Sequence, residues 1–421
     1  MLKVWLIGAA LVAAAPVQAQ VGREAGWNAA RAQVAADYDR IVADVITLTE
    51  IPAPPFKETA RGLHYAGMMR AHGLKDVAID AVGNVTGLRP GGPGGTLAGG
   101  KLLVVSAHLD TVFPEGTPIK VRREGDRLLA PGIGDDTVGL AALLAWMRAL
   151  DAGKVVTGRD ILFVATVGEE GEGDLRGARH LFTKNDYRSR IGDFISVDGS
   201  TPYRVVDGGV GSRRYRVEFT GPGGHSYGAY GLVNPMAAMA GTVQRLYTIT
   251  TPKSPKTTYA ASVVSGGTSV NAIPNKVEML FDMRSESAAE LAKLEAQLMA
   301  MIGEAVAAEN AARDTKEGKV AANPVLIGDR PAGMTVRDEP LVKAVAGAIA
   351  ANGYEPVLGA SSTDSNVPMN LGVPAVTIGA GGGGGRAHSL DEYLDVERTA
   401  FVRGMQTGLD VVIAAAAVPR K

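Results

Sequence analysis

The chain of 421 residues contains no cysteine. Disulfide bonds, thiolate metal ligands and a cysteine nucleophile are therefore excluded, and any bound metal must be held by histidine and carboxylate side chains. The formal net charge is only −1. Because the charge is nearly balanced, it gives no reason to expect a nucleic acid or an anionic membrane as a partner.

Long hydrophobic runs are also scarce, and the one that stands out is at the N-terminus, in "MLKVWLIGAALVAAAPVQAQ". This segment has one lysine, an apolar stretch from Val4 to Ala15 and a small-residue pattern that ends at Ala19. It predicts a secretory signal peptide over residues 1–19, because the apolar stretch is shorter than the roughly 20 residues that a transmembrane helix needs. We therefore expect an exported protein, in the periplasm of a bacterium.

The rest of the composition is that of a globular protein, with 46% apolar and 21% charged residues and enough length for two domains. Two apolar segments, 160–167 and 193–198, are predicted strands, and two others, 137–150 and 174–182, have helical patterns. Such alternation indicates an α/β domain, in which functional sites gather at the carboxyl ends of the strands.

A different pattern begins near residue 212. Strands are predicted at 213–221, 257–267, 276–286 and near 319–326, with helices at 234–249 and 287–312. This β-α-β-β-α-β order is that of a ferredoxin-like α+β domain. The α/β pattern then resumes and ends in a helix near 396–415. We therefore expect an inserted domain over 209–326 within an α/β domain formed by 20–208 and 327–421.

Histidine and acidic residues recur where the predicted α/β strands end. The stretch "KLLVVSAHLDTVFP" (101–114) is a buried strand that ends in His108 and Asp110, which project from the same face because alternate residues of a strand point the same way. Four further segments deliver similar side chains to the same edge: Asp135 and Asp136, Glu169 and Glu170, Asp198, and His388. Two histidines and three carboxylates can hold two Zn²⁺ ions if one aspartate bridges them, and the same donors accept Mn²⁺ or Co²⁺.

The succession HLD, DD, GEEG, VDG and AHS, together with the inserted domain, resembles the co-catalytic zinc metallopeptidase family M20. That family includes carboxypeptidase G, peptidase T, aminoacylase and succinyl-diaminopimelate desuccinylase. The resemblance extends over essentially the whole mature chain. It implies a zinc-peptidase-like α/β/α catalytic domain whose insertion serves as a dimerisation or lid domain, and hence a homodimer.

The resemblance also implies a role for each residue of the motifs. Asp135 bridges two zinc ions. His108 and Asp198 complete one metal site, and Glu170 and His388 complete the other.

Further residues support the metal ligands. The resemblance implies that Glu169 is the general base and that Asp110 orients His108. We interpret Asp136 as a structural neighbour that could cap the following helix. The family often has lysine where this chain has Thr137, which leaves the subfamily open.

Three positions of the inserted domain match as well. His225 in "TGPGGHSYG" is implied to stabilise the oxyanion across a dimer interface. Asn271 and Arg284 are implied to contact substrate, and a guanidinium suits a substrate carboxylate because it can bind both oxygens.

These features predict a metal-dependent hydrolase that cleaves the amide bond of short peptides or N-acyl amino acids with a metal-activated water and Glu169 as base. Whether it is an aminopeptidase, a carboxypeptidase or an acylase stays open. The alternative is a protein of the same fold that binds metal or peptide without turnover.

Overall fold

The computed structural model describes residues 14–72, 74–92 and 100–420. Helix α1 (Ala14–Ala36) includes the predicted cleavage position after Ala19, while the first 13 residues of the predicted signal peptide lie outside the described residues. Export therefore stays a prediction.

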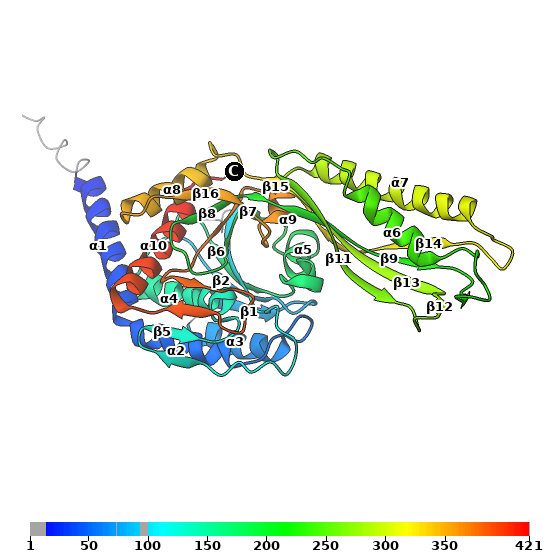
Figure 1. Cartoon of the computed structure of the whole chain (residues 1–421). Helices are drawn as coiled ribbons and strands as arrows, with labels where there is room; N and C mark the ends of the chain where they lie inside the picture. Colours follow the sequence, from blue (N-terminus) through cyan, green and yellow to red (C-terminus); the bar gives the residue numbers. More distant parts are fainter. Residues whose placement is uncertain (1–13, 73, 93–99, 421) are drawn as a thin grey trace, which may run out of the picture.

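A nine-stranded mixed sheet forms the centre of the larger domain (Figure 1). Its order is β1-β2-β6-β3-β7-β17-β8-β15, with β16 also paired to β8. The bounds are Lys75–Ile79 (β1), Val85–Arg89 (β2), Leu102–His108 (β3), Ile161–Thr166 (β6), Ile191–Val197 (β7), Arg204–Gly209 (β8), Gly333–Met334 (β15), Val357–Ser361 (β16) and Ala375–Ile378 (β17). Strand β3 is parallel to both β6 and β7, and all its residues are buried.

Helices cover both faces of this sheet. Successive residues of β3 point to opposite faces, and both sets are buried against helices. Leu103 and Val105 join an apolar core with α1, α2 (Tyr38–Thr49), α3 (Thr59–Ala71), α4 (Val138–Ala152), α8 (Pro340–Ala351) and α10 (Arg398–Ala417). Leu102 and Val104 join a second core on the side of α5 (Arg176–Thr183) and α9 (Asn366–Asn370). The α/β/α layering is confirmed. Of the described helices, α10 alone is long and apolar enough to cross a membrane, and 61% of its most apolar window is buried in this core.

The inserted domain projects from one end of this sheet (Figure 1). It consists of β9 (Gly211–Thr220), α6 (Pro235–Leu246), β11 (Thr257–Gly266), β13 (Lys276–Ser285), α7 (Ala288–Ala312) and β14 (Ala321–Arg330). The sheet order β11-β13-β9-β14 is antiparallel throughout and has the ferredoxin-like topology that the sequence predicts. Apolar residues such as Phe219, Phe281 and Leu298 pack between the sheet and its two helices.

Two paired strands connect the domains. Ser212 of β9 pairs with Arg330 of β14, and Gly209 of β8 pairs with Gly333 of β15. The chain therefore enters and leaves the inserted domain as one antiparallel ribbon. Strand β14 reaches Arg330, four residues beyond the boundary expected at 326, because the ladder with β9 continues to the sheet edge.

A small second sheet of the larger domain lies against the Asp135 turn. Its order is β18-β19-β5-β4, with bounds Gly384–Gly385 (β18), Tyr393–Asp395 (β19), Arg127–Leu129 (β5) and Arg122–Glu124 (β4). This sheet brings the loop that carries His388 next to the segment that precedes Asp135.

Candidate metal centre

The predicted metal ligands come from the carboxyl ends of three neighbouring strands and from two loops beside them. Strands β3, β6 and β7 end at His108, Thr166 and Val197, so that Asp110, Glu169, Glu170 and Asp198 follow at one edge of the sheet. Parallel strands place such residues together, as the sequence predicts.

The Asp135 carboxylate lies between the two histidines. Its Oδ1 is 2.9 Å from Nε2 of His108, and its Oδ2 is 3.1 Å from Nε2 of His388. Nε2 of His388 is also 3.1 Å from Oε1 of Glu170. One carboxylate with an oxygen on each histidine is the arrangement that a bridging ligand requires.

The donor atoms are close enough to surround a cation. One donor atom each from His108, Asp135 and Glu170 lie within 4.8 Å of one another. Asp135 and Asp198 both line a cavity of about 180 Å³, together with Arg204 and Tyr393. Imidazole nitrogens and carboxylate oxygens without thiolates suit Zn²⁺, Mn²⁺ or Co²⁺.

The carboxylates crowd one another in a buried site. Burial, together with the nearby Asp135 carboxylate, raises the pKa of Asp198 to about 7. Burial also raises the pKa of Glu169 well above its usual range, although the Arg330 guanidinium opposes this effect. Without a cation, the carboxylates of this buried site therefore resist full ionisation. Divalent cations would favour their ionised forms by offsetting the negative charge.

Without bound metal, the two histidines supply positive charge to the site. Hydrogen bonds with Asp135 and Glu170 raise the pKa of His388 to about 10. Burial acts to lower the pKa of His108, but the hydrogen bond with Asp135 and the adjacent carboxylates outweigh burial and raise it well above its usual range. Metal binding would replace these protons, since only neutral imidazole is a ligand.

Asp110 is buried and plays two parts. Its backbone carbonyl lies 3.0 Å from Nδ1 of His108. It accepts the Nδ1–H of the tautomer in which Nε2 carries no proton and can bind a metal ion. Its carboxylate accepts the backbone N–H groups of Glu169 at 3.0 Å and of Glu170 at 2.8 Å. The sequence suggests Asp110 as the support of His108, and the structure adds that its side chain fixes the loop of the predicted base.

The side chain of Asp136 has another partner than the sequence interpretation suggests. The Asp136 carboxylate accepts the backbone N–H of His108 at 3.0 Å, and it makes no capping hydrogen bond to α4. The interpretation as a helix cap is therefore wrong, because the side chain turns to the strand end instead. Thr137 is buried, and its hydroxyl donates to the Gly132 carbonyl.

Glu392 is a support that sequence reasoning missed. It is buried and accepts the backbone N–H groups of Gly132, Gly134 and Asp135 at 2.8–2.9 Å. It thereby ties the turn of Asp135 to the segment that begins at His388. An acidic residue four positions after His388, a predicted ligand, was the available signal.

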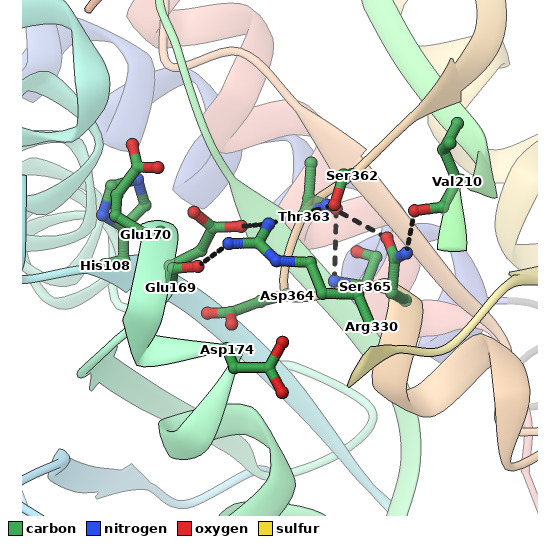
Figure 2. A network of polar contacts seen from close by, with 12 residues as sticks. His108, Glu169, Glu170, Asp174, Val210, Arg330, Ser362, Thr363, Asp364 and Ser365 are labelled. Atoms are coloured by element: carbon green, nitrogen blue, oxygen red, sulfur yellow. Dashed lines mark hydrogen bonds and ion pairs between the residues drawn. The ribbon is translucent and has the colours of Figure 1, made fainter. Parts of the chain in front are cut away.

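Arg330 is a second residue that the sequence did not reveal. It lies at the end of β14 and contacts the carboxylate of Glu169 from the inserted domain (Figure 2). An arginine at a strand end has no spacing that would single it out.

The structure does not bring His225 and Asn271 to the metal centre. His225 is exposed in the short strand β10 (Gly224–His225), and its Nδ1 accepts the backbone N–H groups of Tyr227 and Gly228. Strand β10 pairs with β12 (Ala272–Ile273), which lies at the far end of the inserted domain (Figure 1). Asn271 immediately precedes β12, and its side chain accepts the Ser269 hydroxyl at 2.7 Å.

Arg284 lies closer to the junction of the domains. Its Nε donates to Asp282 at 2.8 Å, and Asp282 also accepts Nε of Arg214 at 3.1 Å. Arg214 reaches the carbonyl of Gly171, directly after Glu170, at 3.4 Å. A chain of polar contacts therefore connects Arg284 with the loop of the predicted base.

Known proteins match this chain both in sequence and in fold. Carboxypeptidase G2 from Pseudomonas sp. (strain RS-16) is 27% identical over 192 residues, which span 44% of this chain and 45% of that protein. Among solved structures, a tripeptidase from Staphylococcus aureus has a TM-score of 0.74 and the aminopeptidase PepT from Bacillus cereus has 0.71. Each is 19% identical, and each alignment covers 90% of this chain and 98% of the other, which shows a shared fold.

The decisive comparison is with families of sequences. The model of peptidase family M20/M25/M40 matches residues 104–414, a range that includes every predicted metal ligand and the whole inserted domain. This chain therefore belongs to peptidase family M20/M25/M40, whose members are metal-dependent hydrolases of peptides and related amides.

Proposed function

We propose that this protein cleaves the terminal amide bond of short peptides or N-acyl amino acids, with two divalent metal ions, Zn²⁺ in the first place, held by His108, Asp135, Glu170, Asp198 and His388. The observation that carries the proposal is the Asp135 carboxylate, which presents one oxygen to each histidine. Two cations bound there would lower the pKa of a water molecule and polarise the substrate carbonyl.

Glu169 follows as the proton carrier. Its carboxylate is buried next to Glu170, and only one of its oxygens is held by Arg330. The other oxygen can take a proton from the attacking water and pass it to the nitrogen of the leaving amine. Water adds to the carbonyl carbon, the C–N bond breaks, and the products are a carboxylate and an amine.

The remaining predicted residues set the substrate. Arg284 is half-exposed and its guanidinium suits the terminal carboxylate of a peptide or N-acyl amino acid. His225 would approach a substrate from a second copy of the chain, which requires a homodimer through the inserted domain. Export by residues 1–19 completes the proposal and places the activity in the bacterial periplasm.

The deciding experiment measures hydrolysis of matched short peptides with free, N-blocked or C-blocked ends, each with added Zn²⁺ and with a chelator. We expect metal-dependent cleavage. A requirement for a free carboxylate identifies a carboxypeptidase or acylase, and a requirement for a free amine identifies an aminopeptidase. Metal binding without cleavage of any peptide or N-acyl amino acid would contradict the proposal and favour a binding protein.

A further inference from the structure

We propose that Arg330 is a positioning residue that the inserted domain supplies to Glu169, and that it aligns this side chain for proton transfer. The inference rests on the proposed function, because it assumes that Glu169 is the base.

The contact joins two groups of one residue to one guanidinium. Nη1 of Arg330 donates to Oε1 of Glu169 at 3.1 Å, and Nη2 donates to the backbone carbonyl of Glu169 at 2.5 Å. The arginine therefore fixes both the side chain and the main chain of the same residue. Figure 2 shows the guanidinium facing both oxygens, with His108 and Glu170 on the far side of Glu169.

The contact is also isolated from water. The side chains of Arg330 and Glu169 are 6% and 5% exposed. Within the described part of the chain, Arg330 is the only hydrogen-bond donor to the Glu169 carboxylate. One carboxylate oxygen is thus fixed, while the second stays available on the side of the metal ligands.

Arg330 itself is held on several sides. Nη1 also donates to the Ser362 hydroxyl at 3.0 Å. The preceding residue, Asp329, donates its backbone N–H to Asp174 at 3.1 Å and accepts Arg179 at its carbonyl. Asp174 lies shortly after Glu169 and Arg179 lies in α5, so the segment that follows Glu169 is joined to the end of β14 at several points.

Arginine suits this task better than lysine. Its planar fork can donate to two acceptors at once, whereas an ammonium group is a single point of charge. A proton carrier must lie within hydrogen-bond reach of the proton it takes, and a displacement of about 1 Å can cost about 10²-fold in rate. The two-point contact is therefore expected to act on kcat.

The test is a double-mutant cycle with Arg330→Gln, Glu169→Gln and both together, assayed on the cleaved peptide with saturating Zn²⁺. We expect R330Q to lower kcat by about 10²-fold, with KM changed by less than about threefold and with the metal content unchanged. In the E169Q background, R330Q should change the residual kcat by less than about threefold, because Arg330 acts through Glu169.

Two further variants keep the test decisive. Arg330→Lys preserves the charge of the buried pair and should fold even if R330Q does not, while its kcat should still be about tenfold lower because the second donor is lost. Arg216→Gln is the matched control, since Arg216 is half-exposed and pairs only loosely with Glu278 at 3.8 Å. Its kcat should equal that of the parent protein.

The inference is overturned if R330Q lowers kcat equally in the parent and E169Q backgrounds, or if it raises KM with kcat unchanged, which would make Arg330 a contact for the substrate. A normal kcat for R330K would also overturn it. A normal kcat for E169Q, by contrast, would refute the proposed function itself, so the two failures are distinguishable.

Discussion

The metal edge of the central sheet and the outer end of the inserted domain differ in how their predicted functional residues are held. His108, Asp135 and Glu170 contact one another or a shared neighbour, although they come from segments far apart in the chain. Within the described residues, the side chains of His225 and Asn271 bond only to groups close to them in the sequence. The first region is assembled within one domain, whereas the second lies at the far end of the inserted domain (Figure 1).

From this difference we predict that changes in the two regions affect metal binding and substrate binding separately. At the metal edge, the buried side chains of Asp110 and Glu392 fix the neighbouring loops by accepting their backbone N–H groups. Changes to the predicted metal ligands of the first region should therefore alter metal content, and changes in the second region should not.

The largest effect is expected for Asp135→Ala. Because this carboxylate faces both histidines, its loss should empty both metal sites and abolish hydrolysis. Metal content by plasma mass spectrometry and peptide hydrolysis measure the two effects together. Two tightly bound ions in this variant would show that Asp135 is not the bridging ligand.

Glu169→Gln should separate chemistry from metal binding inside the same region. The amide cannot take a proton from water, so kcat should fall by about 10²–10⁴-fold while both metals remain. Glu172→Gln is the matched control, because Glu172 is exposed in the same loop. Loss of metal from E169Q would mean that Glu169 is a ligand and not the base.

Asp110→Asn should have an intermediate effect. The substituted amide can accept only one of the two backbone N–H groups that the carboxylate now accepts, so the loop of Glu169 and Glu170 should loosen. We expect metal affinity or activity to fall by about 10–100-fold, as for other supports of metal ligands. Competition with a chromogenic chelator measures the affinity, and an unchanged value would show that the loop needs no such support.

The smallest effect is expected for Arg284→Ala in the inserted domain. It should raise KM about tenfold for substrates with a free carboxylate, because one exposed hydrogen bond to a charged group is lost. Metal content and thermal stability should stay unchanged. Steady-state kinetics on free and C-blocked peptides give the result. A fall in metal content would contradict this expectation, since it would show that the two regions are energetically coupled.

The sequence was sufficient for the layers of the fold and for the residues at the strand ends. Apolar runs buried on both faces identify β3, β6 and β7, and the residues that follow them must meet at one edge. The contact of Arg330 with Glu169 spans 161 positions, and that of Glu392 with Gly134 spans 258. Such pairs leave no periodic pattern, because they depend on how distant segments pack.

The choice between two acceptors of one residue was also beyond the sequence. Spacing places Asp110 beside His108, but only the folded chain shows that its carbonyl faces the ring while its carboxylate holds the next loop. The same limit explains Asp136, whose position before α4 suggests a cap although its side chain accepts the N–H of His108.

The paired strands between the two domains have a mechanical consequence. A ribbon of two hydrogen-bonded strands bends readily across its flat face and resists bending in its own plane, so it permits one principal direction of swing. Arg330 is part of this ribbon, where it pairs with Ser212. Any swing of the inserted domain would therefore shift the side chain that holds Glu169.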